Sequence, residues 1–208
     1  MSGALLFGLG VGLIVLFHAA QVVCGRALGI VPESVGLFVG PKLASFKAGG
    51  TEYRLNLVPS GGAVDFGDQF SELPALKQCL VVLSGPVALL AFGFLLYGFS
   101  GSPGLAFLRA IPQLLQGAFS PSEVGASLVR AYMSLLAANP VAAIGVLALK
   151  VSALNLLPFP GSPGGMIWRS VLRLKAEDPR LLVPRLLGSI AGMGLGFSWL
   201  AAIWQGLA

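Results

Sequence analysis

The chain has 208 residues, of which 56% are hydrophobic and only 10% are charged. Soluble domains carry about 25% charged residues. A chain this apolar could not cover its surface with polar groups in water, so the composition excludes an ordinary soluble domain and indicates a lipid bilayer as solvent. The net charge is +5, but the basic residues lie mostly in loops between apolar runs. Membrane topology explains them better than nucleic-acid binding does.

Four apolar segments are predicted to be membrane-spanning helices, since a span needs about 20 mostly apolar residues. The predicted spans cover residues 4–24, 79–99, 141–157 and 186–204. The third is the shortest and contains Lys150 and Asn155. The whole chain, residues 1–208, is therefore expected to form a single membrane domain.

Basic residues predict the orientation of these spans. They gather in two loops, Arg26, Lys42, Lys47, Arg54 and Lys77 in the first and Arg169, Arg173, Lys175, Arg180 and Arg185 in the last. The middle connection has only Arg109 and Arg130. Because basic loops stay in the cytoplasm, we expect a protein of the bacterial inner (cytoplasmic) membrane with both termini outside the cytoplasm.

Two connections have structure of their own. In the first basic loop, Gly49-Gly50 separates strand-like runs, which predicts a β-hairpin over about residues 44–58. Pro59 should end its second strand. In the middle connection, Ser120 is a capping serine followed by proline and glutamate, which is typical of a helix start. The resulting helix, about residues 121–138, is expected to lie at the membrane interface or to tilt into the bilayer.

The order of these features resembles the site-2 protease family, the zinc metalloproteases that cut within the membrane. The matching motifs are Gly25-Arg26-Ala27-Leu28-Gly29-Ile30, Val39-Gly40-Pro41-Lys42-Leu43, the strand 51–57 with Gly61-Gly62 after it, Ser84-Gly85-Pro86, and Asn155-Leu156-Leu157-Pro158. The resemblance implies an α-helical polytopic membrane protein of about four spans, with a small β-hairpin or sheet in the first cytoplasmic loop.

The resemblance fails at the expected active site. The family carries His-Glu-x-x-His in the first span, where two histidines on one helix face bind zinc and the glutamate acts as general base. A count without gaps places Phe17 and Gln21 at the ligand positions and His18 at the base position. The family's zinc-binding Asp falls on Pro163 by the same count. These four degenerate positions predict neither a catalytic residue nor a metal ligand.

Donor chemistry leads to the same expectation without an alignment. A hydrolytic zinc typically needs three protein ligands, and the chain has one histidine and two cysteines. Within the membrane, His18 with Cys24 and Cys79 is the only conceivable set. Cys24 lies well round the helix from His18, so zinc is not expected and a proteolytically inactive homologue is inferred.

Four polar residues in the spans form a candidate intramembrane site, namely His18, Gln21, Lys150 and Asn155. His18 and Gln21 are three residues apart and share a helix face. They either pair with each other to hold helices together or contact a ligand. Lys150 could snorkel to an interface, contact Asn155 or a helix end, supply a positive charge in place of zinc, or meet an acidic residue of a partner.

Three functions are compatible with these features. The leading hypothesis is a catalytically inactive binding or scaffolding subunit, with another integral membrane protein as partner and no nucleic acid. The second is an intramembrane zinc metalloprotease with a rearranged site. The third is a small transport or channel-accessory subunit in which His18, Gln21 and Lys150 line a polar path.

Overall fold

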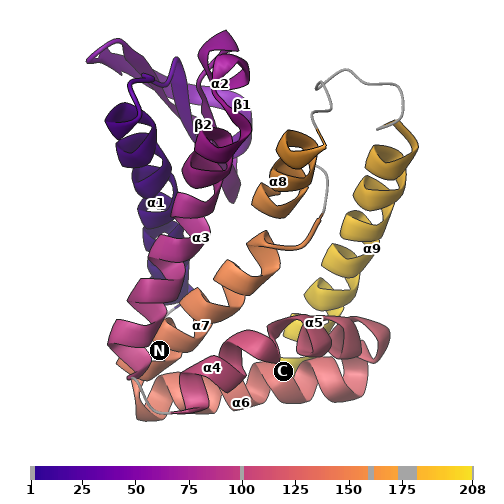
Figure 1. Cartoon of the computed structure of the whole chain (residues 1–208). Coiled ribbons are helices and arrows are strands. Elements are labelled where there is room, and N and C mark those ends of the chain that lie inside the picture. The colour runs from indigo at the N-terminus through magenta and orange to yellow at the C-terminus, as the bar shows by residue number, and fades with distance from the viewer. Residues whose placement is uncertain (1–2, 99–100, 159–161, 173–181, 208) are drawn as a thin grey trace. The chain divides into compact units, whose positions relative to one another are not determined.

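The computed structural model describes residues 3–98, 101–158, 162–172 and 182–207 (Figure 1). The chain divides into two compact units. The first lies within residues 1–89 and 170–173, and the second within residues 90–169 and 174–208.

The first half of the described chain contains a long helix, two strands, a short helix and a second long helix. These are α1 (Gly3–Ala27), β1 (Ser34–Ala48), β2 (Thr51–Asp65), the short α2 (Asp68–Glu72) and α3 (Ala75–Tyr97). The second half is helical. It contains α4 (Gly101–Leu108), α5 (Ala110–Phe119), the π-helical turn η1 (Pro121–Gly125), α6 (Ala126–Ala138), α7 (Pro140–Asn155), α8 (Pro163–Val171) and α9 (Leu182–Leu207).

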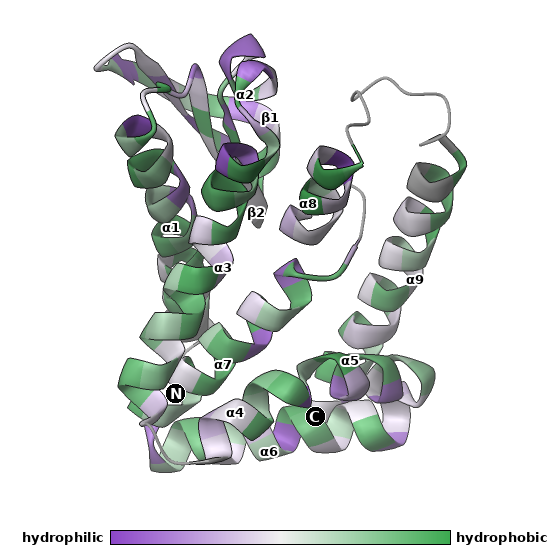
Figure 2. Ribbon diagram, viewed as in Figure 1, coloured by the Kyte–Doolittle hydropathy of each residue, from purple (hydrophilic) through white to green (hydrophobic). Residues whose placement is uncertain are grey.

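Three of the described helices are long and apolar enough to cross a membrane, within residues Phe7–Ala27, Ala75–Tyr97 and Leu186–Leu207. Figure 2 shows the hydrophobic residues along α1 and α3. The helix α7 is equally apolar but has 16 residues, which is shorter than a typical span. The predicted class, a helical membrane protein with a small sheet, is confirmed.

The sheet consists of β1 and β2, which pair antiparallel. Gly49 and Gly50 form the turn between them, with φ of 57° and 82°, so the predicted turn is at the right place. The strands are much longer than residues 44–58, and β2 does not end at Pro59. It continues because the residues after Gly61 (φ 70°) turn back to pair with the start of β1, Val64 opposite Val35 and Ala63 opposite Gly36.

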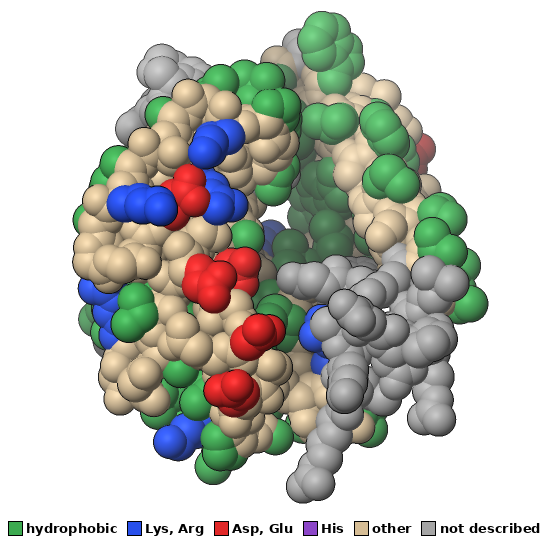
Figure 3. Space-filling model, turned by 90° about the horizontal axis from the view of Figure 1, so that it is seen from above, with side chains coloured by type: hydrophobic (Ala, Val, Ile, Leu, Met, Phe, Trp, Pro, Cys, Tyr) green, Lys and Arg blue, Asp and Glu red, His purple; other side chains and the backbone are tan. Residues whose placement is uncertain are grey.

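The outer part of the hairpin has two different faces. On one face, the rings of Phe46 and Tyr53 stack with their centroids 5.1 Å apart. On the other, Glu52 lies 3.3 Å from Lys42 Nζ and 2.6 Å from Arg54 Nη2. The hydrogen bond from Arg54, with help from Lys42, lowers the pKa of Glu52 to about 2. Figure 3 shows basic and acidic side chains side by side on the face seen from above.

The predicted helix at residues 121–138 begins differently from a capped α-helix. The Ser120 side chain makes no capping hydrogen bond. Its carbonyl oxygen instead accepts from the Gly125 N–H at 2.9 Å, which closes the wide π turn of η1. The helix α6 follows and ends at Ala138, where Asn139 caps α7 by accepting from the Ala142 N–H at 3.0 Å.

Glycines bring α3 and α7 into close contact within the second unit. A Cβ atom at Gly93 would lie 2.6 Å from Leu149 Cγ, and one at Gly145 would lie 2.9 Å from the backbone N of Tyr97. In lipid there is no hydrophobic force between apolar helices, so close backbone packing of this kind is a main source of their association.

We expect Gly93→Ala to destabilise the protein and Gly192→Ala, its matched control on α9, not to do so. The added methyl at Gly93 overlaps Leu149, and overpacking of this kind costs about 1–3 kcal/mol. A methyl at Gly192 meets nothing within 4 Å, and it gains about 0.5–1 kcal/mol of helix propensity. Unfolding in mixed detergent micelles measures both. Equal stabilities of the two variants would contradict the packing described for α3 and α7.

Candidate functional site

The helix α1 brings Phe17, His18 and Gln21 together in the first unit. Phe17 and His18 are buried, and their rings meet edge to face with centroids 5.2 Å apart. His18 Nδ1 lies 3.1 Å from Gln21 Oε1. The amide oxygen accepts a hydrogen bond only from a ring that is protonated on Nδ1. The predicted pair on one helix face therefore forms, and one nitrogen of the single histidine is occupied by it.

The strand β2 covers the other side of the histidine ring. A Cβ atom at Gly62 would lie 2.6 Å from His18 Nε2 and 2.6 Å from the carbonyl oxygen of Gly36. Only a glycine lets the strand pass this close to both the helix and its neighbouring strand. The imidazole is thus enclosed between Gln21, Phe17 and the backbone of the sheet.

Phe17 fills the space between α1 and α3. A Cβ atom at Gly85 of α3 would lie 2.8 Å from Phe17 Cε2 and Cζ, so the ring packs directly against the α3 backbone. Ser84-Gly85-Pro86 thereby has a packing role, since Gly85 admits the ring. By the gapless count, this ring occupies a position at which the family carries a zinc-binding histidine.

The donor atoms in this unit do not fit a zinc ion. His18 bonds to Gln21, whereas Cys24 packs against a different cluster formed by Ile30, Phe66 and Val81. Within the described part of the chain, no three His, Cys, Asp or Glu side chains form a group that could hold a metal.

Pro163 begins α8 and is buried. It belongs to the second unit, whereas Phe17, His18 and Gln21 belong to the first. Proline offers no side-chain donor at this place. The preceding residues 159–161 of the same motif lie outside the described part of the chain.

Lys150 finds its partner on a helix that the sequence analysis did not consider. Its Nζ donates to Gln113 Oε1 of α5 at 2.7 Å. Asn155, an expected partner, instead donates from Nδ2 to the Val151 carbonyl oxygen at 2.8 Å. Of the four predicted polar residues, His18 and Gln21 pair in the first unit, whereas Lys150 and Asn155, in the second unit, bond to other residues. Gln113 could have been found as a polar residue within an apolar stretch, which is a functional signal in membrane segments.

Comparison with known proteins identifies the class to which this fold and site belong. The chain is a polytopic membrane protein, and residues 6–181 match the model of Peptidase family M50. The chain belongs to this family, the site-2 proteases. It is 29% identical over 106 residues to a "Putative zinc metalloprotease" of Chlamydia pneumoniae, over 40% of this chain. It is 29% identical over 110 residues to a protein so named from Campylobacter jejuni, over 46% of this chain.

These relatives are much longer than the part that matches. The aligned segments cover 17% of the Chlamydia pneumoniae protein and 30% of the Campylobacter jejuni protein. A third relative, from Chlamydia trachomatis, is 29% identical over 128 residues, and the aligned segment covers 20% of that protein. The comparisons therefore establish family membership, and the resemblance identified from the motifs is confirmed.

We expect Gly62→Ala to disrupt the packing of the sheet on α1, with Gly36→Ala on the neighbouring strand as control. The methyl at Gly62 overlaps both His18 Nε2 and Gly36 O, whereas one at Gly36 lies no closer than 3.5 Å to its neighbours. We expect Gly62→Ala to lower stability by about 1–3 kcal/mol and Gly36→Ala by under about 0.5 kcal/mol. Thermal unfolding gives the stabilities, and limited proteolysis reports detachment of the hairpin. If Gly62→Ala changed neither the stability nor the proteolysis pattern, the contact with His18 would be contradicted.

Proposed function

We propose that this chain is a member of the site-2 protease family that does not hold the hydrolytic zinc and acts as a binding or scaffolding subunit of a membrane complex. The observation that carries the proposal is the set of side chains at the counted motif positions. Phe17 packs its ring against α3, and His18 bonds to Gln21 beneath the sheet. These side chains stabilise the fold in the place where the family's pattern provides ligands and a base.

Retention of the surrounding framework supports the binding part of the proposal. The long helices α1 and α3, the sheet, and the close contacts at Gly62 and Gly85 are all present. A membrane fold that lacks the zinc ligands but keeps its helices and sheet can still recognise another membrane protein. Recognition of this kind depends on the shape of the surface and on the positions of its polar groups. The partner is an integral protein of the same membrane, here the bacterial inner membrane, with both termini of this chain outside the cytoplasm.

The names of the relatives motivate the alternative, a zinc metalloprotease with a rearranged site. Its ligands would be His18 and the cysteines Cys24 and Cys79. Such a site would require His18 to leave Gln21 and Cys24 to leave the Ile30 cluster. Metal content separates this alternative from the proposal.

We expect the purified protein to contain far less than one zinc per chain, because the described residues present no three-ligand set. Incubation with zinc followed by removal of free metal should leave this ratio unchanged, and elemental analysis measures it. His18→Ala, with Gln21→Ala as the matched control, should have no effect on metal content. About one zinc per chain that His18→Ala removes would overturn the proposal in favour of the rearranged protease.

We expect a second integral membrane protein to co-purify with the chain from native membranes in a fixed molar ratio. The extraction uses a mild detergent, because helix contacts in the membrane rest on packing that harsh detergents disrupt. Quantitative mass spectrometry gives the ratio, and an unrelated tagged membrane protein of similar abundance is the control. Elution of the chain alone would contradict the subunit role while leaving the zinc result unaffected.

A further inference from the structure

Within the second unit, α9 provides a reference for a surface that faces lipid. It is apolar over a full span, Leu186–Leu207. Its exposed positions carry large hydrophobic side chains, among them Leu186, Leu187, Ile190, Met193, Phe197, Leu200, Ile203 and Trp204. Phe197, near the middle of this stretch, is 72% exposed. Such a surface is stable in hydrocarbon and unfavourable in water.

The helix α6 has the opposite kind of exposed surface. Its exposed residues lie on one face and are all small or polar, namely Ser127, Arg130, Ala131, Ser134, Ala137 and Ala138. No large hydrophobic residue of α6 is exposed, and Leu136 is 1% exposed. With 13 residues, the helix is about 20 Å long, which is too short to cross the roughly 30 Å hydrocarbon core.

Contacts place α5 and α6 against the C-terminal half of α9. From α5, the Ala118 carbonyl oxygen accepts from the Ser198 hydroxyl, and the Leu114 carbonyl oxygen accepts from Trp199 Nε1 at 3.0 Å. From α6, Val129 lies against Gly206, where an added Cβ atom would be 2.7 Å from Val129 Cβ. Ser198 and Trp199 lie just past the middle of the apolar stretch Leu186–Leu207, and Gly206 lies at its end, so α6 is nearer to the end of the span than α5 is.

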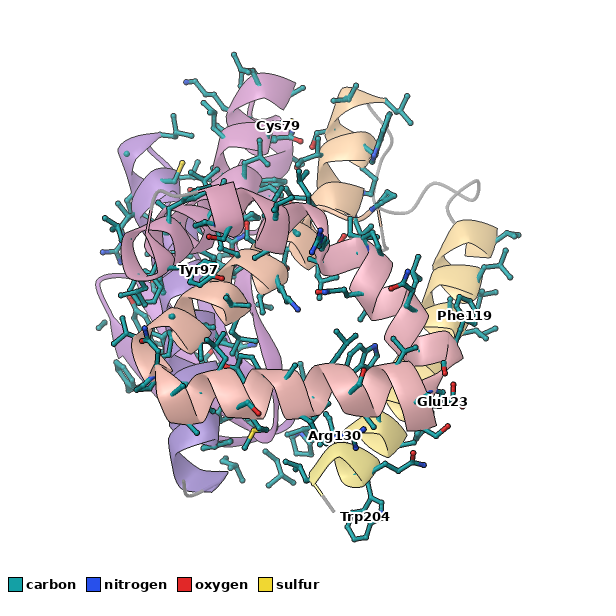
Figure 4. The ribbon with its side chains drawn as sticks, turned by 90° about the horizontal axis from the view of Figure 1, so that it is seen from below. Cys79, Tyr97, Phe119, Glu123, Arg130 and Trp204 are labelled. Atoms are coloured by element: carbon teal, nitrogen blue, oxygen red, sulfur yellow. The ribbon has the colours of Figure 1, made fainter. Side chains whose placement is uncertain are left out.

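Two further observations concern α5 and the end of α9. Lys150 Nζ donates to Gln113 Oε1 of α5 at 2.7 Å, so α5 presents a polar group towards α7. Trp204, near the end of α9, is 79% exposed. Figure 4, the view from below, shows the Trp204 ring pointing away from the ribbons of this unit. Tryptophan side chains gather where hydrocarbon meets water, so Trp204 indicates a membrane boundary at this end.

We propose that α6 lies along the outer, non-cytoplasmic surface of the membrane with its Ser/Arg/Ala face in water, and that α5 lies beneath it, on the hydrocarbon side, and supplies the polar group that accepts from Lys150. The basic residues just before the apolar stretch of α9, Arg180 and Arg185, place the start of α9 in the cytoplasm by the positive-inside rule. The end of α9, and with it α6, is then outside.

Cysteine accessibility tests this placement on the full chain. In a background with Cys24→Ser and Cys79→Ser, single cysteines are introduced by Ser134→Cys on α6, Phe197→Cys on α9 and Lys77→Cys at the start of α3. A membrane-impermeant maleimide is applied to right-side-out and to inside-out membrane vesicles. Ser127→Cys, on the same α6 face, repeats the measurement should Ser134→Cys fold poorly.

We expect Ser134→Cys to react in right-side-out vesicles at least about ten times faster than Phe197→Cys, because only a thiol in water ionises to the reactive thiolate. Lys77→Cys should react only in inside-out vesicles, and Phe197→Cys only after detergent is added. Protection of both α6 cysteines at the level of Phe197→Cys would overturn the proposal by placing α6 in hydrocarbon or under another protein surface. Reaction of the α6 cysteines from the side that labels Lys77→Cys would overturn it as well.

Discussion

The structure depends on one constraint, which is that polar groups in an apolar surrounding need a partner inside the protein. In hydrocarbon an unpaired polar group costs several kcal/mol. The helices satisfy the hydrogen bonds of the backbone. Two side-chain pairs do the same for the histidine of α1 and the lysine of α7. His18 bonds to Gln21 within the first unit, and Lys150 bonds to Gln113 within the second. Both pairs join a titratable group to a neutral amide, and so no buried ion pair has to form.

A second principle follows from the solvent. Because lipid gives apolar helices no reason to associate beyond close packing, large side chains are set against glycines. Phe17 meets Gly85, Leu149 meets Gly93, and Trp199 meets Gly117. The first of these contacts bears directly on function. A ring that packs against the α3 backbone contributes to the fold of the first unit, and the same ring stands where the family's pattern has a ligand. In the proposed function, this ring therefore stabilises the helix pair at a position where the counted pattern has a metal ligand.

The chain therefore combines family membership with a site whose donor atoms do not suit the family's metal. Residues 6–181 match the family, and the framework is a set of apolar helices with a small antiparallel sheet. The proposed placement of α6 at the outer surface gives the second unit a lipid-facing helix, α9, and a water-facing one. A partner protein would then reach this unit either through the membrane, along α9, or from the outside, along α6, and these two routes call for different chemistry.

The sequence by itself determined the solvent, the long apolar helices, the turn at Gly49-Gly50 and the shared helix face of His18 and Gln21, because each rests on local composition or on residues a few positions apart. Only the tertiary structure decided the rest. The return of β2 past Pro59 depends on pairing with residues near 35, far away in the chain. Gln113 was missed because its partner Lys150 is 37 residues away. The covering of His18 by Gly62 likewise joins a helix to a distant strand. Local patterns predict elements well, whereas contacts between distant residues arise only when the elements pack.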